Sequence, residues 1–135
     1  MISIRSPIDI ESRRVLFRSA AAVLANSGHE PVGLVGLEAM AAGGVACTGC
    51  SGEEYAISSE NTLVLETNDP LEFVGLFETL RANPPQERAL RQAGQWTAQH
   101  YAWPQVIHRI LLPRLQLLTP GRGPIGTARR QTYAA

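Results

Sequence analysis

Short apolar runs alternate with longer helical patterns along the chain. Three mostly apolar runs bounded by turn formers are typical of buried strands: residues 22–25, 45–48 and 62–65. Between the first two runs, Leu34, Leu37 and Met40 recur at helical spacing, and the pair Gly43-Gly44 ends that helix. The order strand, helix, strand, strand predicts part of a doubly wound α/β sheet with parallel strands.

Three more helices are predicted after the last of these strands, at residues 69–82, 83–101 and 103–118. Each has a proline near its first position, where the missing N–H costs nothing. In the first of them, the predicted apolar stripe consists of Leu71, Val74, Phe77 and Leu80. Trp96 and Trp103 are interpreted as core residues, and Pro113 is expected to kink the last helix.

The composition limits the classes of protein. The chain has 135 residues, enough for one domain, and its 12 basic and 12 acidic residues cancel, which argues against a nucleic-acid partner. All basic residues are Arg, and the charge is +2 in residues 1–19, −9 in 20–80 and +7 in 81–135. No run is long enough to span a membrane and no signal peptide is recognisable, so a cytoplasmic location is expected.

The two ends of the chain are interpreted separately from the rest. Leu16-Phe17-Arg18-Ser19 can be back-translated into the end of a common sequencing adapter. One hypothesis is therefore that residues 1–19 are a read-through leader, and the alternative is an ordinary amphipathic helix. Residues 119–135 follow a Pro- and Gly-rich stretch and are expected to be a disordered tail.

The loop after the first strand and the start of the helix that follows it carry the candidate chemistry. Glu30 and Gly33 lie before the helix and Glu38 lies about two turns into it, so the two carboxylates are eight residues apart. The free amides of Gly33, Leu34 and Val35 at a helix N-terminus can cradle a phosphate. Carboxylates repel phosphate but accept hydrogen bonds from hydroxyls. A diphosphate flanked by hydroxyl pairs describes a nucleotide sugar.

The string from Glu30 to Glu38, Glu-Pro-Val-Gly-Leu-Val-Gly-Leu-Glu, resembles the E-x7-E motif of retaining glycosyltransferases of the two-domain GT-B class, family 4 ("glycosyl transferases group 1"). The resemblance covers residues 20–118 and includes Leu-Glu-Ala-Met-Ala-Ala-Gly after the motif, Asp69-Pro70 and a late Tyr-Ala-Trp. It departs from the family at Val32, where Phe is usual. It implies the fold of a partial Rossmann-like C-terminal donor domain, with parallel strands followed by helices.

The resemblance also implies the roles of individual residues. Glu30 would be the catalytic residue and would contact the donor sugar's hydroxyls, and Glu38 would contact the ribose. The amides around Gly33, Leu34 and Val35 would face the diphosphate. The implied reaction is retaining transfer of a hexosyl group from a nucleotide sugar to an unknown acceptor, which could be a sugar, a glycan or a lipid.

The distribution of charged residues along the sequence indicates whether this chain can catalyse the reaction alone. A departing diphosphate needs fixed positive charge, yet residues 20–80 contain no Arg or Lys. The cationic residues of the family, and its acceptor domain, have no counterpart here. The chain is therefore expected to be a donor-binding fragment without activity of its own. The alternative is a non-catalytic Rossmann-like module that binds a nucleotide or a partner chain.

The remaining motifs favour structural roles. Cys47 and Cys50 form a C-x-x-C pair that could be redox-active or half of a zinc site, for which His29, His100 or His108 would have to converge. Structural thiols are favoured, and neither a metal nor a cofactor is expected. The arginines of the C-terminal helices are interpreted as a solvated face, and His100 and His108 as helix-surface residues.

Overall fold

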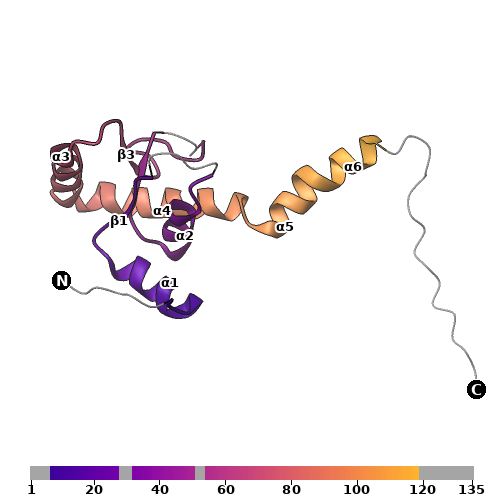
Figure 1. The fold of residues 1–135 in the computed structure, drawn as a ribbon, viewed down its shortest axis with the longest axis horizontal. Coiled ribbons are helices and arrows are strands. Elements are labelled where there is room, and N and C mark those ends of the chain that lie inside the picture. The colour runs from indigo at the N-terminus through magenta and orange to yellow at the C-terminus, as the bar shows by residue number, and fades with distance from the viewer. Residues whose placement is uncertain (1–6, 28–31, 51–53, 119–135) are drawn as a thin grey trace, which may run out of the picture. The chain divides into compact units, whose positions relative to one another are not determined.

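The computed structural model describes residues 7–27, 32–50 and 54–118. The chain divides into two compact units, Met1–Ala102 and Trp103–Ala135. The elements of the first unit are α1 (Ile10–Ser19), β1 (Val23–Ala25), α2 (Leu34–Ala42), β2 (Ala46–Gly49), β3 (Leu63–Leu65), α3 (Pro70–Arg81) and α4 (Pro84–His100), as Figure 1 shows. The described part of the second unit consists of α5 (Trp103–Val106), the π-helical turn η1 (Ile107–Leu111) and α6 (Leu112–Leu118).

The described strands form one parallel sheet in the order β1-β2-β3. Leu24 pairs with Cys47 in the first ladder, and Cys47 pairs with Leu63 in the second. The central strand β2 is buried along its whole length, as expected when both faces of a parallel sheet are covered. The predicted α/β class, with parallel strands followed by helices, is confirmed.

The core lies on the two sides of this sheet. One cluster groups Leu37 and Met40 of α2 with Ala46, Tyr55 and Ala98. The other cluster lies around β2 and β3, and its buried residues are Val45, Cys47, Leu63, Leu65, Leu80 and Leu90. Helix α4 contributes to both clusters, and α2 contacts α1, α4 and the first two strands (Figure 1). Helix α2 is therefore held on several sides, which fixes the position of its N-terminus.

The predicted apolar stripe of α3 is correct at Leu80, which is buried, and wrong at Leu71, which is 74% exposed. Phe73 and Leu76, outside the predicted stripe, pack with Leu80 in the second cluster. Positions 73, 76 and 80 also follow helical spacing, so the sequence allowed two neighbouring stripes. Contact of α3 with β3 and α4 selects the second.

The prediction that the two tryptophans are core residues is also wrong: Trp96 is 65% and Trp103 is 74% exposed. The buried residues of α4 are Leu90, Gly94 and Ala98. A Cβ at Gly94 would lie 3.2 Å from Cγ of Met40, so small residues bring α4 close to α2. The bulky Trp96 lies outside this contact, and the centroid of its ring is 4.1 Å from the centroid of the His100 ring.

Helix α1 is formed by residues 10–19. Its N-cap Asp9 accepts hydrogen bonds from the backbone N–H and the hydroxyl of Ser12. The helix contacts α2, and Phe17 packs against the first core cluster. A Cβ at Gly44 would overlap the carbonyl oxygen of Phe17, so the start of β2 fits closely under α1. Residues 119–135, predicted to be a tail, lie outside the described residues.

The second unit has a deformed helix before Pro113. The N–H of Leu112 donates to the carbonyl of Ile107, which is the i-to-i+5 pattern of a π-helix. Pro113 cannot donate a backbone hydrogen bond, and a π-turn before it is one of the known ways in which a helix accommodates such a break. Within residues 7–27, 32–50 and 54–118, no helix combines the length and the apolar character required to cross a membrane.

Candidate functional site

The carboxyl ends of the parallel strands open into a hollow of about 290 Å³. Its lining consists of residues at or just after each strand end: Asn26, Ser27, Gly49, Cys50, Leu65, Glu66, Thr67 and Asn68. In open α/β sheets, ligands bind at this edge. Apart from Cys50 of the C-x-x-C pair, none of these residues was a candidate from the sequence, although they lie at or after the ends of the predicted strands.

The N-terminus of α2 follows β1 along the chain and carries the predicted phosphate cradle. Gly33 is the N-cap residue, with φ 61° and ψ 56° in the left-handed region, and no described side chain caps the helix. The following residues, Leu34 and Val35, are 63% and 41% exposed. Their amides belong to the first turn, where no intrahelical acceptor exists and the helix dipole is positive. The turn therefore presents donors suited to an anion.

Buried side chains lie beneath this first turn. The phenolic O–H of Tyr55, which is 4% exposed, donates a hydrogen bond of 2.5 Å to the carbonyl of Gly33. A Cβ at Gly36 would meet the Tyr55 hydroxyl and would lie 2.8 Å from Cγ2 of Thr48. Thr48 is fully buried, and its hydroxyl has no hydrogen-bond partner among the described residues. The turn thus rests directly on polar groups of the interior.

Glu38 lies in the second turn of α2, beside α1. Its Oε2 is 3.2 Å from Nη1 of Arg13, and the two side chains are 42% and 37% exposed. The carboxylate lines a groove of about 280 Å³ between the two helices, together with Ile10, Arg13, Arg14, Phe17, Ala41 and Ala42. Glu38 is separated from Gly33 by about 7.5 Å of helix rise. The other motif carboxylate, Glu30, lies outside the described residues.

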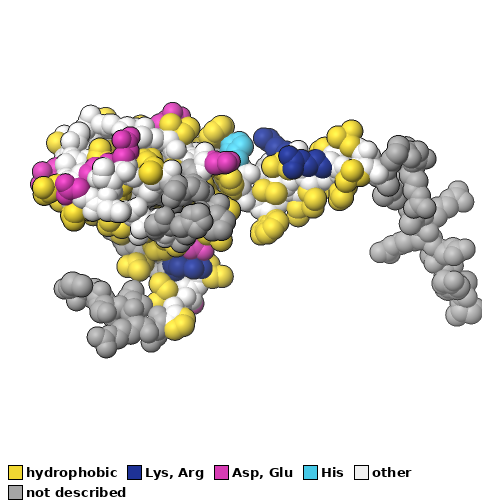
Figure 2. Space-filling view, turned by 45° about the horizontal axis from the view of Figure 1, so that its top comes forward, with side chains coloured by type: hydrophobic (Ala, Val, Ile, Leu, Met, Phe, Trp, Pro, Cys, Tyr) yellow, Lys and Arg dark blue, Asp and Glu magenta, His cyan; other side chains and the backbone are white. Residues whose placement is uncertain are grey.

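The arginines of this groove were missed by the sequence analysis. Positive charge was sought within residues 20–80, where none exists, but the fold brings Arg13 and Arg14 from α1 next to Glu38. Figure 2 shows acidic side chains scattered over the visible face of the first unit. Ile10, Arg13 and Phe17 recur at helical spacing, which could have predicted a helix with one face packed against the rest of the domain.

The loop between β3 and α3, which lines the hollow, is ordered by a carboxylate. Glu72 accepts hydrogen bonds from the backbone N–H groups of Glu66 and Thr67 at 2.8 and 2.9 Å and from the Thr67 hydroxyl at 2.6 Å. These bonds, led by that of the hydroxyl, lower the pKa of Glu72. Asp69 caps α3 by accepting a hydrogen bond at 2.9 Å from the N–H of Leu71.

The two cysteines of the C-x-x-C pair differ in their burial. Cys47 is fully buried in the second core cluster, whereas Cys50 is exposed. Within the described part of the chain, no three His, Cys, Asp or Glu side chains are arranged to hold a metal ion.

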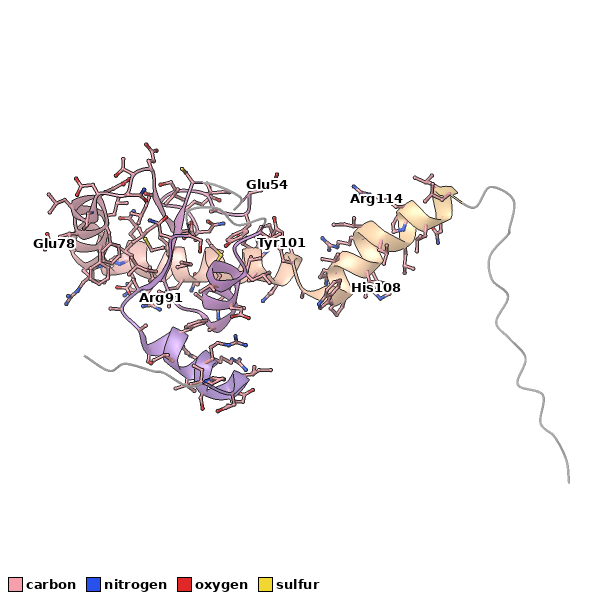
Figure 3. All side chains as sticks on the ribbon, in the orientation of Figure 1. Glu54, Glu78, Arg91, Tyr101, His108 and Arg114 are labelled. Atoms are coloured by element: carbon pink, nitrogen blue, oxygen red, sulfur yellow. The ribbon has the colours of Figure 1, made fainter. Side chains whose placement is uncertain are left out.

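Most arginines of the C-terminal helices are exposed, as predicted, but Arg91 on α4 is half-buried (labelled in Figure 3). Its guanidinium bonds to the carbonyl of Gly43 at 2.9 Å and pairs with Glu87 at 2.8 Å. Arg91 therefore fastens α4 to the C-terminus of α2, a role that the prediction of a solvated face did not include.

Comparison with solved structures identifies the fold. A sucrose-phosphate synthase from Thermosynechococcus elongatus superimposes with a TM-score of 0.71 at 26% identity, over 82% of this chain and 29% of that one. The C-terminal domain of a glycosyl transferase group 1 family protein from Francisella tularensis superimposes with a TM-score of 0.61 at 22% identity, over 73% of this chain and 50% of that one. No family model matches the sequence, and no curated protein is similar to it.

These similarities establish the architecture. The chain has the fold of the Rossmann-like C-terminal domain of GT-B glycosyltransferases. It spans half or less of the two proteins that it resembles.

Proposed function

We propose that this chain carries the nucleotide-sugar site of a retaining glycosyltransferase of the group 1 type. The observation that carries the proposal is the N-terminus of α2, where Gly33 adopts a left-handed conformation and no described side chain occupies the first amides. Two further observations support it: the GT-B fold and the position of this turn directly after a parallel strand.

Each group of the site has a part in this proposal. The amides of Leu34 and Val35 hold the donor's diphosphate, and the helix dipole adds positive charge there. Glu38 accepts hydrogen bonds from the ribose hydroxyls through Oε1, because its Oε2 already contacts Arg13. Glu30 contacts the hydroxyls of the transferred hexose and is the catalytic residue. The acceptor is a sugar, a glycan or a lipid.

The reaction also needs more positive charge than the described residues place at this turn. The leaving diphosphate must be stabilised as the glycosidic bond breaks, and helix amides supply only part of that stabilisation. Arg13 and Arg14 lie beside Glu38 in the second turn rather than at the first amides. We therefore propose that the chain binds a nucleotide sugar without transferring its sugar at ordinary enzyme rates.

Binding of nucleoside diphosphates tests the proposal. We expect at least one of UDP, GDP and ADP to bind the full chain weakly in a calorimetric titration. Glu38→Gln should weaken that binding about tenfold, since it replaces a charged acceptor of hydroxyl hydrogen bonds. Glu78→Gln, at an exposed position of α3 (Figure 3), is the matched control and should bind like the wild type.

Two results would contradict the proposal. Binding of none of the three nucleotides would favour a module that binds a partner chain. Equal affinity of Glu38→Gln and the wild type would remove Glu38 from the site.

A further inference from the structure

The phenol of Tyr55 makes a buried contact to the turn on which the proposed function rests. Its O–H donates to the carbonyl of Gly33, 22 residues earlier in the sequence. Tyr55 belongs to neither the E-x7-E string nor the hollow at the strand ends. It approaches the turn from the interior, where its side chain forms part of the first core cluster.

Gly33 needs such an external anchor. A helix N-cap is normally held by its own side chain, which accepts a hydrogen bond from an amide of the first turn. Glycine has no side chain, and its left-handed conformation at φ 61° is one of several that it adopts easily. The N–H of Gly36 donates to the carbonyl of Gly33 at 3.2 Å, a bond that spans only the first turn of the helix itself. The Tyr55 hydroxyl adds a bond to that carbonyl from outside the helix, at 2.5 Å.

Tyr55 is itself held firmly. The side-chain amide of Asn61 donates to the backbone carbonyl of Tyr55 at 2.8 Å and to the Thr97 hydroxyl at 3.0 Å. The Tyr55 ring meets the ring of Tyr101 edge-on, with 5.8 Å between centroids. Thr97 lies on α4 and Tyr101 directly follows that helix, so these contacts connect Tyr55 to the C-terminal end of α4, where Tyr101 is labelled in Figure 3.

We infer that Tyr55 is a positioning residue for the anion-binding turn of α2. By holding the Gly33 carbonyl, it fixes the peptide plane that also contains the N–H of Leu34, and so sets the direction of this first donor of the turn. This inference rests on the proposed function for its ligand. A turn whose donors are already aligned loses less conformational freedom when an anion binds.

The test compares two Tyr→Phe variants in the full chain. Tyr55→Phe removes the hydroxyl and keeps the ring, whereas Tyr101→Phe removes the hydroxyl from the other ring of the same pair and is the matched control. Two quantities are measured by NMR: the UDP affinity, with GDP or ADP where one of these binds better, and the hydrogen exchange of the Gly36 amide. We expect Tyr55→Phe to weaken the affinity about fivefold and to speed the exchange several-fold. Tyr101→Phe should change neither.

The outcomes separate this inference from the proposed function. Unchanged affinity and unchanged Gly36 exchange in Tyr55→Phe would overturn the role of Tyr55, as would a lower melting temperature with the wild-type affinity. If the wild-type chain binds no nucleoside diphosphate, the proposed function fails. The role of Tyr55 is then still decided by the Gly36 amide: faster exchange in Tyr55→Phe supports it as the residue that orders this turn, and unchanged exchange contradicts it. The exchange measurement needs no ligand, so it can be made even if no nucleotide binds.

Discussion

The guanidinium of Arg13 lies 3.2 Å from the carboxylate of Glu38, so that a residue of α1 pairs with a residue of the candidate motif. Helix α1 thereby becomes a neighbour of the proposed ribose contact. The pair also keeps one oxygen of the carboxylate occupied, which leaves Oε1 for a ligand.

Loss of this ion pair should have a small effect on stability. Both side chains are more than a third exposed, and pairs of this kind contribute about 0.2–1 kcal/mol. We expect Arg13→Gln to lower the free energy of unfolding within that range in low salt and by less at high ionic strength, where charges are screened. Urea denaturation of this variant and of Arg14→Gln, its neighbour in the same groove, measures the difference. A loss above about 2 kcal/mol would show that the pair is far less solvated than its exposure indicates.

Two Gly→Ala changes should have opposite effects on stability, because Gly36 is closely packed at the first turn of α2 whereas Gly75 has open space beside it. At Gly36 a Cβ would meet the Tyr55 hydroxyl, and we expect a destabilisation of about 1–3 kcal/mol. At Gly75, in the middle of α3, a Cβ would have no described atom within 4 Å, so alanine should stabilise the helix by about 0.5–1 kcal/mol. Thermal and urea unfolding of the two variants provide the measurement. Equal effects of the two changes would contradict the packing described here.

The sequence was sufficient to predict the elements because their signals are local. Asp69 and Asn83 cap the helices that they precede, and Gly43 ends α2 in the left-handed conformation. Each of these signals acts within one or two helical turns. The strand runs are similarly local, since a buried parallel strand is apolar along its length.

The packing faces could not be predicted in the same way. Trp96 is exposed because Gly94, two residues earlier, brings the opposite face of α4 against Met40 of α2, and the sequence around Trp96 does not show which face of α4 meets that distant helix. The pairing of Arg13 with Glu38 and the bond from Tyr55 to Gly33 join residues 25 and 22 positions apart. Such contacts follow from how the helices are arranged on the sheet. The sequence therefore predicted the helix N-terminus at which we propose anion binding, but not the groups that support it.

Glu72 should make the stability depend on pH in the acid range. Its pKa is lowered from 4.5 by the hydroxyl of Thr67 and by the amides of Glu66 and Thr67. Because the folded pKa is below the unfolded one, its stabilising effect is fully present above about 4.5 and is lost as the pH falls through the folded pKa. We expect Glu72→Gln to be less stable than the wild type at neutral pH and the difference to shrink below pH 4.5. Urea denaturation between neutral and acid pH measures it.

Glu78→Gln is the control for this dependence, since Glu78 is an exposed carboxylate of the same helix. Its stability should follow that of the wild type across the pH range. A stability difference for Glu72→Gln that stays constant down to low pH would mean that the ionised form is not what orders the loop.

Two fully buried threonines should respond in opposite ways to replacement by valine. The hydroxyl of Thr62 donates to the carbonyl of Ala46 at 2.8 Å, whereas that of Thr48 has no partner among the described residues. Valine keeps the shape and the β-branching, so the changes differ mainly in the hydrogen bond that is lost. Thr62→Val should destabilise the protein by about 1 kcal/mol, because it removes a buried bond and leaves a carbonyl with one donor fewer.

Thr48→Val should stabilise the protein by about 1 kcal/mol, since it relieves a buried polar atom of its desolvation cost. The free energies of unfolding of both variants, measured in urea, provide the comparison. If Thr48→Val were destabilising by as much as Thr62→Val, its hydroxyl would have to bond in solution to a group or water beneath α2. The interior under the anion-binding turn would then be hydrated, and Tyr55 would share the support of that turn.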